Sequence, residues 1–190
     1  MAGRSEEGWE QMIEIAIDGY LLQGKLADAL RTIVGSDSWK GSEIPVPGTR
    51  RRWDMGYEIG GVRTVVEFDG DAHYRDSLKI KTDIEKDDLA RKSQISVVRF
   101  PYWVQLTKET LLHYFGLRAN VRQDFPHGFI TTKIFPASFC SLGIERFRKE
   151  FESLPDSVQN AVANSLRDRA KEYGACYVVP NELRHILITT

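Results

Sequence analysis

The stretch RRWDMGYEIGGVRTVVEFDGDAHY, residues 51–74, contains two short extended runs separated by a pair of glycines, Gly60 and Gly61. Two adjacent glycines readily adopt the positive φ angles of a two-residue hairpin turn, so the pattern predicts antiparallel strands over residues 52–59 and 62–68. The second strand leads directly into a group of acids. Carboxylates gathered at the end of a buried strand repel one another and resist desolvation, so they require a compensating cation or a functional role.

The acids at the end of the predicted hairpin favour a metal site. Glu67 and Asp69 are two positions apart, so their side chains share one face of the strand, about 6.6 Å apart, while Phe68 points into the core. The hairpin brings Asp54, on the first strand, close to the same end. These carboxylates, together with the Phe68 carbonyl, form the hard-oxygen set that Mg²⁺ or Mn²⁺ prefers. A metal held there would neutralise charge on a phosphodiester and acidify a bound water, which predicts a hydrolytic nuclease.

The order of features around these acids resembles the PD-(D/E)XK nuclease superfamily. The matching pattern, WD…VVEFDGDAHY…TDIEKDDLARKSQISVVRF, covers residues 54–100, about a quarter of the chain. It is similar to the branch of very-short-patch repair endonucleases and small domains with the motif ExDGxxH. In that branch a strand aspartate, the motif segment, an acidic helix (here with Asp83 and Asp87) and a strand ending in Arg-Phe follow in this order. The resemblance implies an α/β fold with a restriction-endonuclease-like core, a mixed sheet of four or five strands flanked by helices.

Carried over residue by residue, the resemblance implies that Asp54 and Glu67 are metal ligands, with the Phe68 carbonyl and Asp69 completing the set. Asp69 stands where many members of the superfamily have lysine. His73 occupies the motif histidine, where it acts in catalysis or orients Asp69. The implied catalytic residues are therefore Asp54, Glu67, Asp69 and His73.

Three features depart from the family pattern. Trp53 replaces the motif proline, Gln94 stands where relatives commonly turn with glycine, and the motif lysine is absent. The last departure leaves the general base or water-orienting group open, and the candidates are His73, Lys79 and Lys81.

The predicted activity is hydrolysis of DNA phosphodiester bonds by a restriction-type or defence endonuclease, with Mg²⁺ as cofactor and Mn²⁺ as a substitute. The expected substrate is double-stranded DNA, and a homodimer is the simplest way to bring two sites to one duplex. A cognate methyltransferase or a defence complex is a candidate partner. Candidate DNA contacts are the cations on either side of the acids: Arg50, Arg51, Arg52, Lys79 and Lys81.

Other interpretations of the same residues remain open. An acidic strand end followed by glycine is often a solvated turn, and a basic run is often a solvated surface. The nuclease fold can also serve a nucleic-acid-binding or assembly subunit without catalysis, or a monomeric repair or nicking nuclease. Glu10 and Glu14 share one side of a predicted helix and can reach a metal or lie exposed. A set of aromatic residues fits either base stacking or a core: Tyr102, Trp103, Phe125, Phe129, Phe135 and Phe139.

The rest of the sequence predicts mainly helices. Apolar residues at helical spacing predict two helices within residues 6–34, whereas the Gly-, Ser- and Pro-rich residues 35–52 predict a loop or an irregular edge segment. A helix over residues 77–92 has a thin apolar side made of Ile80, Ile84 and Leu89. The remaining predicted elements are a strand over 95–100, a helix over 107–115 between Thr107 and Gly116, and a helix over 156–173.

The length of 190 residues fits one domain of ordinary size, or one domain with a substantial appendage. We expect residues 1–116 to form the nuclease core and residues 117–190 a helical extension for dimerisation, partner docking or DNA contact. With 42% hydrophobic and 28% charged residues, the chain is neither disordered nor membrane-spanning.

Compartment and redox state follow from the first residues and the cysteines. The N-terminal residues lack the apolar segment of a signal peptide, which predicts a cytoplasmic protein. Cys140 and Cys176 lie in apolar settings, which predicts buried thiols rather than a disulfide or a zinc site. The net charge of −1 does not exclude nucleic acid, because the acids can mask a local basic face.

Overall fold

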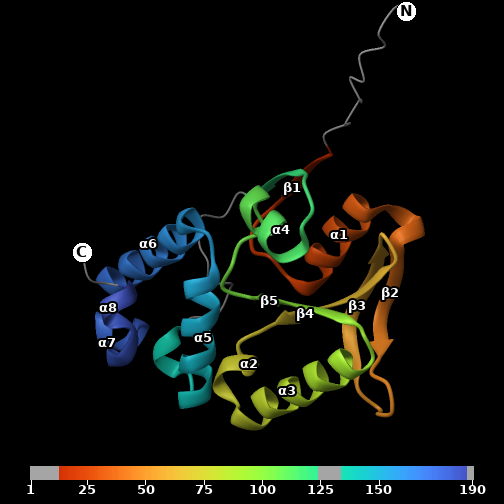
Figure 1. Cartoon of the computed structure of the whole chain (residues 1–190). Helices are drawn as coiled ribbons and strands as arrows, with labels where there is room; N and C mark the ends of the chain where they lie inside the picture. Colours follow the sequence, from red (N-terminus) through yellow and green to blue (C-terminus); the bar gives the residue numbers. More distant parts are fainter. Residues whose placement is uncertain (1–12, 124–133, 188–190) are drawn as a thin grey trace, which may run out of the picture.

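In the computed structural model the chain has an α/β fold, and the structure describes residues 13–123 and 134–187 (Figure 1). A mixed four-stranded sheet has the order β2-β3-β4-β5, and a second sheet consists of two parallel strands, β1 and β6. The described strands are β1 (Glu14–Ile17), β2 (Trp39–Pro45), β3 (Arg52–Ile59), β4 (Val62–Asp69), β5 (Ser96–Pro101) and β6 (Asn120–Gln123).

Eight α-helices and two short 3₁₀ turns occur in the described residues. The helices are α1 (Gln23–Ser38), α2 (Ala72–Arg75), α3 (Ser77–Lys92), α4 (Lys108–Phe115), α5 (Ser141–Ser153), α6 (Asp156–Tyr173), α7 (Ala175–Val178) and α8 (Arg184–Leu187). The 3₁₀ turns are η1 (Pro136–Ser138) and η2 (Asn181–Leu183).

The predicted hairpin is confirmed. β3 and β4 pair in antiparallel fashion, with Met55 opposite Val66 and Ile59 opposite Val62. Gly60 and Gly61 have φ angles of 58° and 80°, the left-handed values that a two-residue turn of this kind needs at both central positions. The turn therefore sets the register that decides which residues face each other at the far end of the hairpin.

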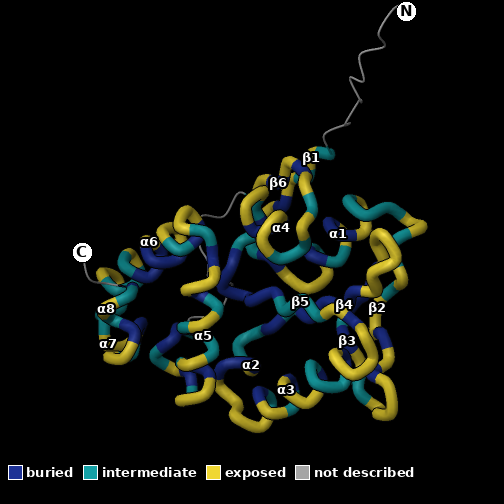
Figure 2. Tube along the Cα trace, viewed as in Figure 1, coloured by how far each residue is buried: buried dark blue, intermediate teal, exposed yellow. Residues whose placement is uncertain are grey.

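Helices cover both faces of the main sheet. α1 and α4 lie on one face and α3 on the other, while α5 to α8 stand beside the sheet near the end of β4 (Figure 1). The larger core lies on the side of α1 and α4 and continues among the C-terminal helices; its fully buried members include Leu26, Val66, Phe100 and Phe147. A smaller core fills the space between α3 and the sheet around Trp53, Val65 and Ala90. In Figure 2 dark blue stretches accordingly lie in β3 and β4, whereas the edge strand β2 is mostly exposed.

α3 confirms the predicted helix, and Ile80 and Leu89 of its predicted apolar side pack toward the sheet. Parallel neighbours such as β4 and β5 need a crossover, and α3 provides it. The expected apolar side is wrong at Ile84, which is 55% exposed. The side that faces the sheet carries Ile80, Asp83, Lys86 and Ala90, so two of the four buried residues of this helix are charged.

The first predicted helix is wrong where the structure describes it. Ile13, Ile15 and Ile17 alternate along an extended segment, and β1 pairs in parallel with β6. β-branched residues at alternating positions suit a strand better than a helix once a partner strand is present. Glu14 is exposed on β1, and Glu10 lies outside the described residues. The second predicted helix is confirmed as α1, which continues past Val34 with a non-helical Gly35.

Residues 35–52 contain the end of α1 and an irregular edge strand rather than a simple loop. β2 pairs with β3, but the register shifts between Trp39 and Gly41. Gly41 and Glu43 have φ angles of 105° and 56°, which twist this edge away from regular pairing.

The predicted end signals of the later helices are confirmed. The Thr107 hydroxyl accepts a hydrogen bond from the Thr110 amide at the start of α4, and Gly116 ends the helix with a φ angle of 65°. α6 occupies residues 156–173, as predicted. The turn before β5 also contains a left-handed residue, Gln94, with a φ angle of 56°.

The aromatic residues and the cysteines differ in how far they are buried. Tyr102, Trp103, Phe135 and Phe139 lie in the core, whereas Phe125 and Phe129 lie outside the described residues. The expectation of two buried thiols is wrong for Cys176, which is exposed because the short helix α7 buries Val178 instead; Cys140 is half-buried. Among the described helices, none has both the length and the apolar character needed to cross a membrane.

Candidate functional site

The hairpin register brings Asp54 to the end of β4. Met55 is opposite Val66, so one residue further along the register Asp54 is opposite Glu67. The Asp54 carboxylate accepts a hydrogen bond from the Phe68 amide, with 2.8 Å between nitrogen and Oδ2. The amide and carbonyl of a residue in a strand point to the same side of the strand, so the Phe68 carbonyl points to the β3 side, as the Phe68 amide does. Asp54 thus lies close to the end of β4, as the hairpin predicts.

Lys86 of α3 reaches the same place. Its ammonium group donates to the Glu67 carboxylate and, at 2.6 Å, to the carbonyl oxygen of Arg52. Glu67 and Lys86 are 3% and 5% exposed, whereas Asp54 is half-buried. The strand motif of this chain has no lysine. Helix α3, which crosses behind the sheet, places Lys86 beside Glu67 instead.

The surroundings of Lys86 and Asp54 shift both groups towards neutrality. Burial lowers the pKa of Lys86 to about 8, and the nearby Arg99 guanidinium contributes to the decrease. Burial raises the pKa of Asp54, against the opposing effects of the Phe68 amide and Lys86. In both groups burial outweighs the stabilising contacts, so the charged form of each is less favoured than in water.

Asp69 lies in a second, adjacent group of charges. The Nδ1 atom of His73 lies 3.0 Å from Asp69 Oδ1 and 2.6 Å from Asp83 Oδ2. The ligand atoms of Asp69, His73 and Asp83 all lie within 4.8 Å of one another, and the three residues are buried. By distance alone this group can hold a metal ion.

Arginines already occupy this second group. Arg99 donates to both carboxylate oxygens of Asp69, at 3.0 and 3.2 Å, and its Nε donates to Asp87 at 3.0 and 3.1 Å. Arg146 of α5 donates to Asp69 and, at 3.0 Å, to Asp83. Each of these aspartates therefore has a cationic partner from the protein itself.

The pKa values of Asp69 and His73 follow from these contacts. Burial raises the pKa of Asp69, but Arg99, the hydrogen bond from His73 and Arg146 outweigh it and hold that pKa well below its usual value. Burial lowers the pKa of His73, but hydrogen bonds to Asp69 and Asp83 outweigh it, so the net shift is upward. Both partners are thus stabilised in their charged forms.

The two groups differ in how readily a divalent cation can enter. Arg99 holds its partners with a planar fork that keeps its charge at any accessible pH. Lys86 is a single ammonium with a lowered pKa on a flexible stem, so it can leave Glu67 or lose its proton. The oxygen set of Asp54, Glu67 and the Phe68 carbonyl is therefore the better fit for Mg²⁺.

The predicted DNA contacts lie around the same end of the hairpin. Arg50 is exposed, Arg51 forms an ion pair of 2.7 Å with Glu85 of α3, and Arg52 donates to the Glu43 carbonyl at 2.8 Å. Arg50 and Arg51 line a surface depression beside α3. The other two candidates, Lys79 and Lys81, lie in the first turns of α3 and are half-buried and exposed, respectively.

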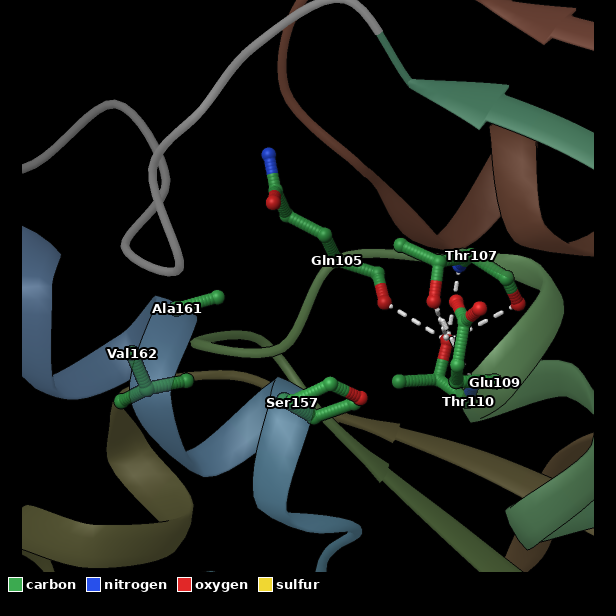
Figure 3. Close-up of a pocket in the computed structure, with 8 residues that line it drawn as sticks. Gln105, Thr107, Glu109, Thr110, Ser157, Ala161 and Val162 are labelled. Atoms are coloured by element: carbon green, nitrogen blue, oxygen red, sulfur yellow. Dashed lines mark hydrogen bonds between the residues drawn. The ribbon is translucent and has the colours of Figure 1, made fainter.

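A separate cavity of about 250 Å³ lies between the beginnings of α4 and α6 (Figure 3). The hydrogen bonds drawn there belong to the start of α4, where the Thr110 hydroxyl donates to the Gln105 carbonyl at 2.8 Å. Its lining contains none of the residues of the two charge groups. The cavity is therefore not the candidate site.

Comparisons of the chain with protein-family models, with curated proteins and with solved structures found no match.

Three residues of the site were missing from the sequence prediction: Lys86, Arg99 and Arg146. Lys86 has a signal in the sequence, because Ile80, Asp83, Lys86 and Ala90 are spaced so as to share one side of a helix. Arg99 also has a signal in the sequence, because it lies in the Arg-Phe end of the predicted strand over residues 95–100. In the structure it is opposite Glu67 in the pairing of β4 with β5. Arg146 has no such signal, because it is far from the motif in sequence.

Asp69→Asn is expected to change how stability depends on pH. A carboxylate with a lowered folded-state pKa contributes stability that is present above its unfolded pKa of about 3.9 and is lost as pH falls below it. The wild-type free energy of unfolding should therefore drop steeply below about pH 4, while the variant should be weaker by about 3 kcal/mol at pH 7 and change less on acidification.

Urea unfolding at pH 7, 5, 4 and 3 measures this difference. Asp88→Asn serves as the control, because Asp88 is paired only with Arg91 on the surface of α3 in the contacts of the described residues. Parallel pH curves for the wild type and Asp69→Asn would contradict the assignment of Asp69 as a buried, ionised group.

Proposed function

We propose that this protein is a metal-dependent endonuclease that hydrolyses phosphodiester bonds of double-stranded DNA with a restriction-endonuclease-like core. The observation that carries the proposal is the meeting of Asp54, Glu67 and Lys86 at the end of two neighbouring strands. Two acids and a lysine at one strand end are a set that binds a hard cation and a phosphate together.

The topology supports the proposed core. Helix α1 is followed by the antiparallel strands β2, β3 and β4, the crossover helix α3 and the parallel strand β5. This arrangement agrees with the mixed, helix-flanked sheet that the resemblance implies. It also puts the acidic hairpin end and α3 on the same side of the sheet.

In the proposed site, Asp54 and Glu67 hold Mg²⁺ with the Phe68 carbonyl. The bound ion supplies charge neutralisation at the phosphate and a more acidic water. The Phe68 amide orients Asp54, with 2.8 Å between the bonded atoms. Lys86 donates to Glu67 and lies where it can donate to a phosphate oxygen or accept a proton. The strand motif of this chain has no lysine for that role.

Asp69 and His73 support this site rather than bind the metal. The carboxylate oxygens of Asp69 accept hydrogen bonds from Arg99 and Arg146, and Asp69 is 0% exposed. His73 contacts Asp69 and Asp83 through the same ring nitrogen. Their proposed task is to fix the end of β4, on which Glu67 and Phe68 depend.

Cleavage of supercoiled plasmid in Mg²⁺, in Mn²⁺ and in EDTA tests the proposal. Asp54→Ala and Glu67→Ala should lower the rate by about 10²-fold or more in either metal, since each removes a ligand of the ion. Glu58→Gln is the matched control, because Glu58 is an exposed acid on the same strand, β3, at the opposite end. The control should cleave at the wild-type rate.

The products distinguish the candidate modes of action. Linear plasmid and a dimeric mass in solution would indicate a double-strand cutter, whereas nicked plasmid and a monomeric mass would indicate a repair or nicking nuclease. Absence of cleavage by folded wild-type protein that binds DNA would contradict the proposal. It would favour a binding or assembly subunit that uses the buried charges for structure.

A further inference from the structure

The side chain of Arg146, on α5, contacts three other elements around the candidate site. It is only 13% exposed. Its Nη1 donates to Asp83 of α3 at 3.0 Å and to the carbonyl of His73 in α2 at 3.2 Å, and its Nη2 donates to Asp69 at the end of β4. Asp69 and Arg146 are 77 positions apart in the chain, so α5 binds the site by a long-range contact.

The guanidinium is held firmly in its own position. Its Nε donates to Glu150, one turn along α5, at 2.8 Å. Its central carbon lies 4.9 Å from the centre of the Tyr74 ring, and the Tyr74 hydroxyl donates to Glu150. Four of the five N–H donors of an arginine are thus used, and the plane of the group is set by the ring beneath it.

Asp69 connects Arg146 to the proposed metal ligands through the backbone of β4. It follows Phe68 directly, and the Phe68 amide holds Asp54. The Asp69 carbonyl accepts a hydrogen bond of 2.9 Å from the Tyr102 amide beyond β5. A displacement of the Asp69 side chain therefore moves the Phe68–Asp69 peptide, which carries the Phe68 carbonyl, and through Phe68 it moves the amide that holds Asp54.

We infer that Arg146 is a positioning residue for the proposed nuclease site, acting through Asp69 on the Phe68 peptide. The inference rests on the proposed function and adds that the C-terminal helices complete the site. It concerns a residue outside the motif segment, which ends at Phe100.

The test compares Arg146→Met, Arg146→Lys and Lys149→Met. Lys149 is an exposed cation on the same helix and lines the same surface pocket as Arg146, but it has no hydrogen bond or ion pair to Asp69 or Asp83 among the contacts of the described residues. Its replacement therefore removes the same charge without breaking those bonds. For Arg146→Met we expect kcat for plasmid cleavage to fall by about 10-fold or more while KM changes little, because the ligands are displaced but the DNA surface is intact. Arg146→Lys should recover part of the loss, since it keeps the charge without the fork.

Amide hydrogen exchange provides a readout that does not depend on cleavage. The Phe68 and Tyr102 amides report on the end of β4, and both should exchange faster in Arg146→Met than in the wild type and in Lys149→Met. Faster exchange confined to α5, or an unchanged kcat and unchanged exchange at Phe68 and Tyr102, would overturn the inference. If Arg146→Met does not fold, Arg146→Lys decides by the same criteria.

These measurements separate this inference from the proposed function. If the wild-type protein does not cleave DNA, the proposed function fails, and the exchange data alone judge the link from Arg146 to the Phe68 peptide. If the wild type cleaves but Arg146→Met matches it in kcat and exchange, the proposed function stands and the positioning role is wrong.

Discussion

Lys86→Met is expected to lower plasmid cleavage by about 10³-fold, within the range typical of removing a proton-transfer group. Lys86 touches Glu67 and the Arg52 carbonyl and lies beside Asp54, so it is the cation nearest to the proposed ligands among the contacts of the described residues. Methionine keeps the length and the apolar stem but removes the donor and the charge. The rate in saturating Mg²⁺ measures the effect.

The same variant should bind Mg²⁺ more tightly than the wild type. In the wild type the ion must displace an ammonium group from Glu67, whereas in the variant that carboxylate has no competing cation. Without metal, Lys86→Met should lose roughly 3 kcal/mol of stability, because a buried carboxylate is left unpaired, and Mg²⁺ should restore part of it. Thermal unfolding with and without Mg²⁺ measures both quantities.

Lys108→Met is the control for both measurements, because Lys108 is exposed on α4, on the other face of the sheet. It should match the wild type in rate and in the shift caused by Mg²⁺. A Lys86→Met protein with wild-type cleavage would contradict the catalytic role. A variant with lost cleavage and unchanged Mg²⁺ binding would place the role of Lys86 in proton transfer or phosphate contact alone.

Gly143→Ala is expected to lower the free energy of unfolding by about 3 kcal/mol or more, which is the upper end of the range for substitutions that overpack a core. Gly143 lies where α5 crosses α2, and a Cβ atom there would lie 1.8 Å from the Tyr74 carbonyl oxygen and 2.6 Å from its carbon. These are backbone atoms, so a side-chain rotation cannot relieve the clash. α5 must move away, which breaks the 3.1 Å hydrogen bond from the Cys140 amide to the same carbonyl and withdraws Arg146 from Asp69.

Gly24→Ala is the matched control for this substitution. Gly24 is in α1, has no atom within 4 Å of the position of an added Cβ, and has no left-handed φ angle. Alanine there should stabilise the protein by about 0.5 to 1 kcal/mol through helix propensity. Urea unfolding of both variants gives the comparison, and equal stability of Gly143→Ala and the wild type would contradict the close approach of α5 to α2.

The local features of the hairpin were predictable from the sequence. Gly60 and Gly61 determine the turn, the turn determines the register, and the register brings Asp54 opposite Glu67. The limits of α4 were predictable for a similar reason, since a threonine cap and a left-handed glycine act within one turn of the helix. In each case the deciding interactions lie between residues that are near one another in the chain.

The first helix and the buried side of α3 were not predictable in the same way. β1 exists because β6, more than one hundred residues later, supplies its hydrogen-bond partner. α3 buries Asp83 and Lys86 because Glu67, His73 and the arginines compensate their charges, whereas a pattern of apolar residues favours Ile84. Local periodicity carries no information about such distant partners.

The sequence by itself determined the acidic hairpin end, the face shared by Glu67 and Asp69, and the helix and strand that follow them, α3 and β5. Only the tertiary structure decided which cation each acid meets: Lys86 for Glu67, and Arg99 with Arg146 for Asp69. The physical reason is that a buried charge is tolerated only with a partner at hydrogen-bonding distance, and the packing of α3, β5 and α5 against β4 selects that partner.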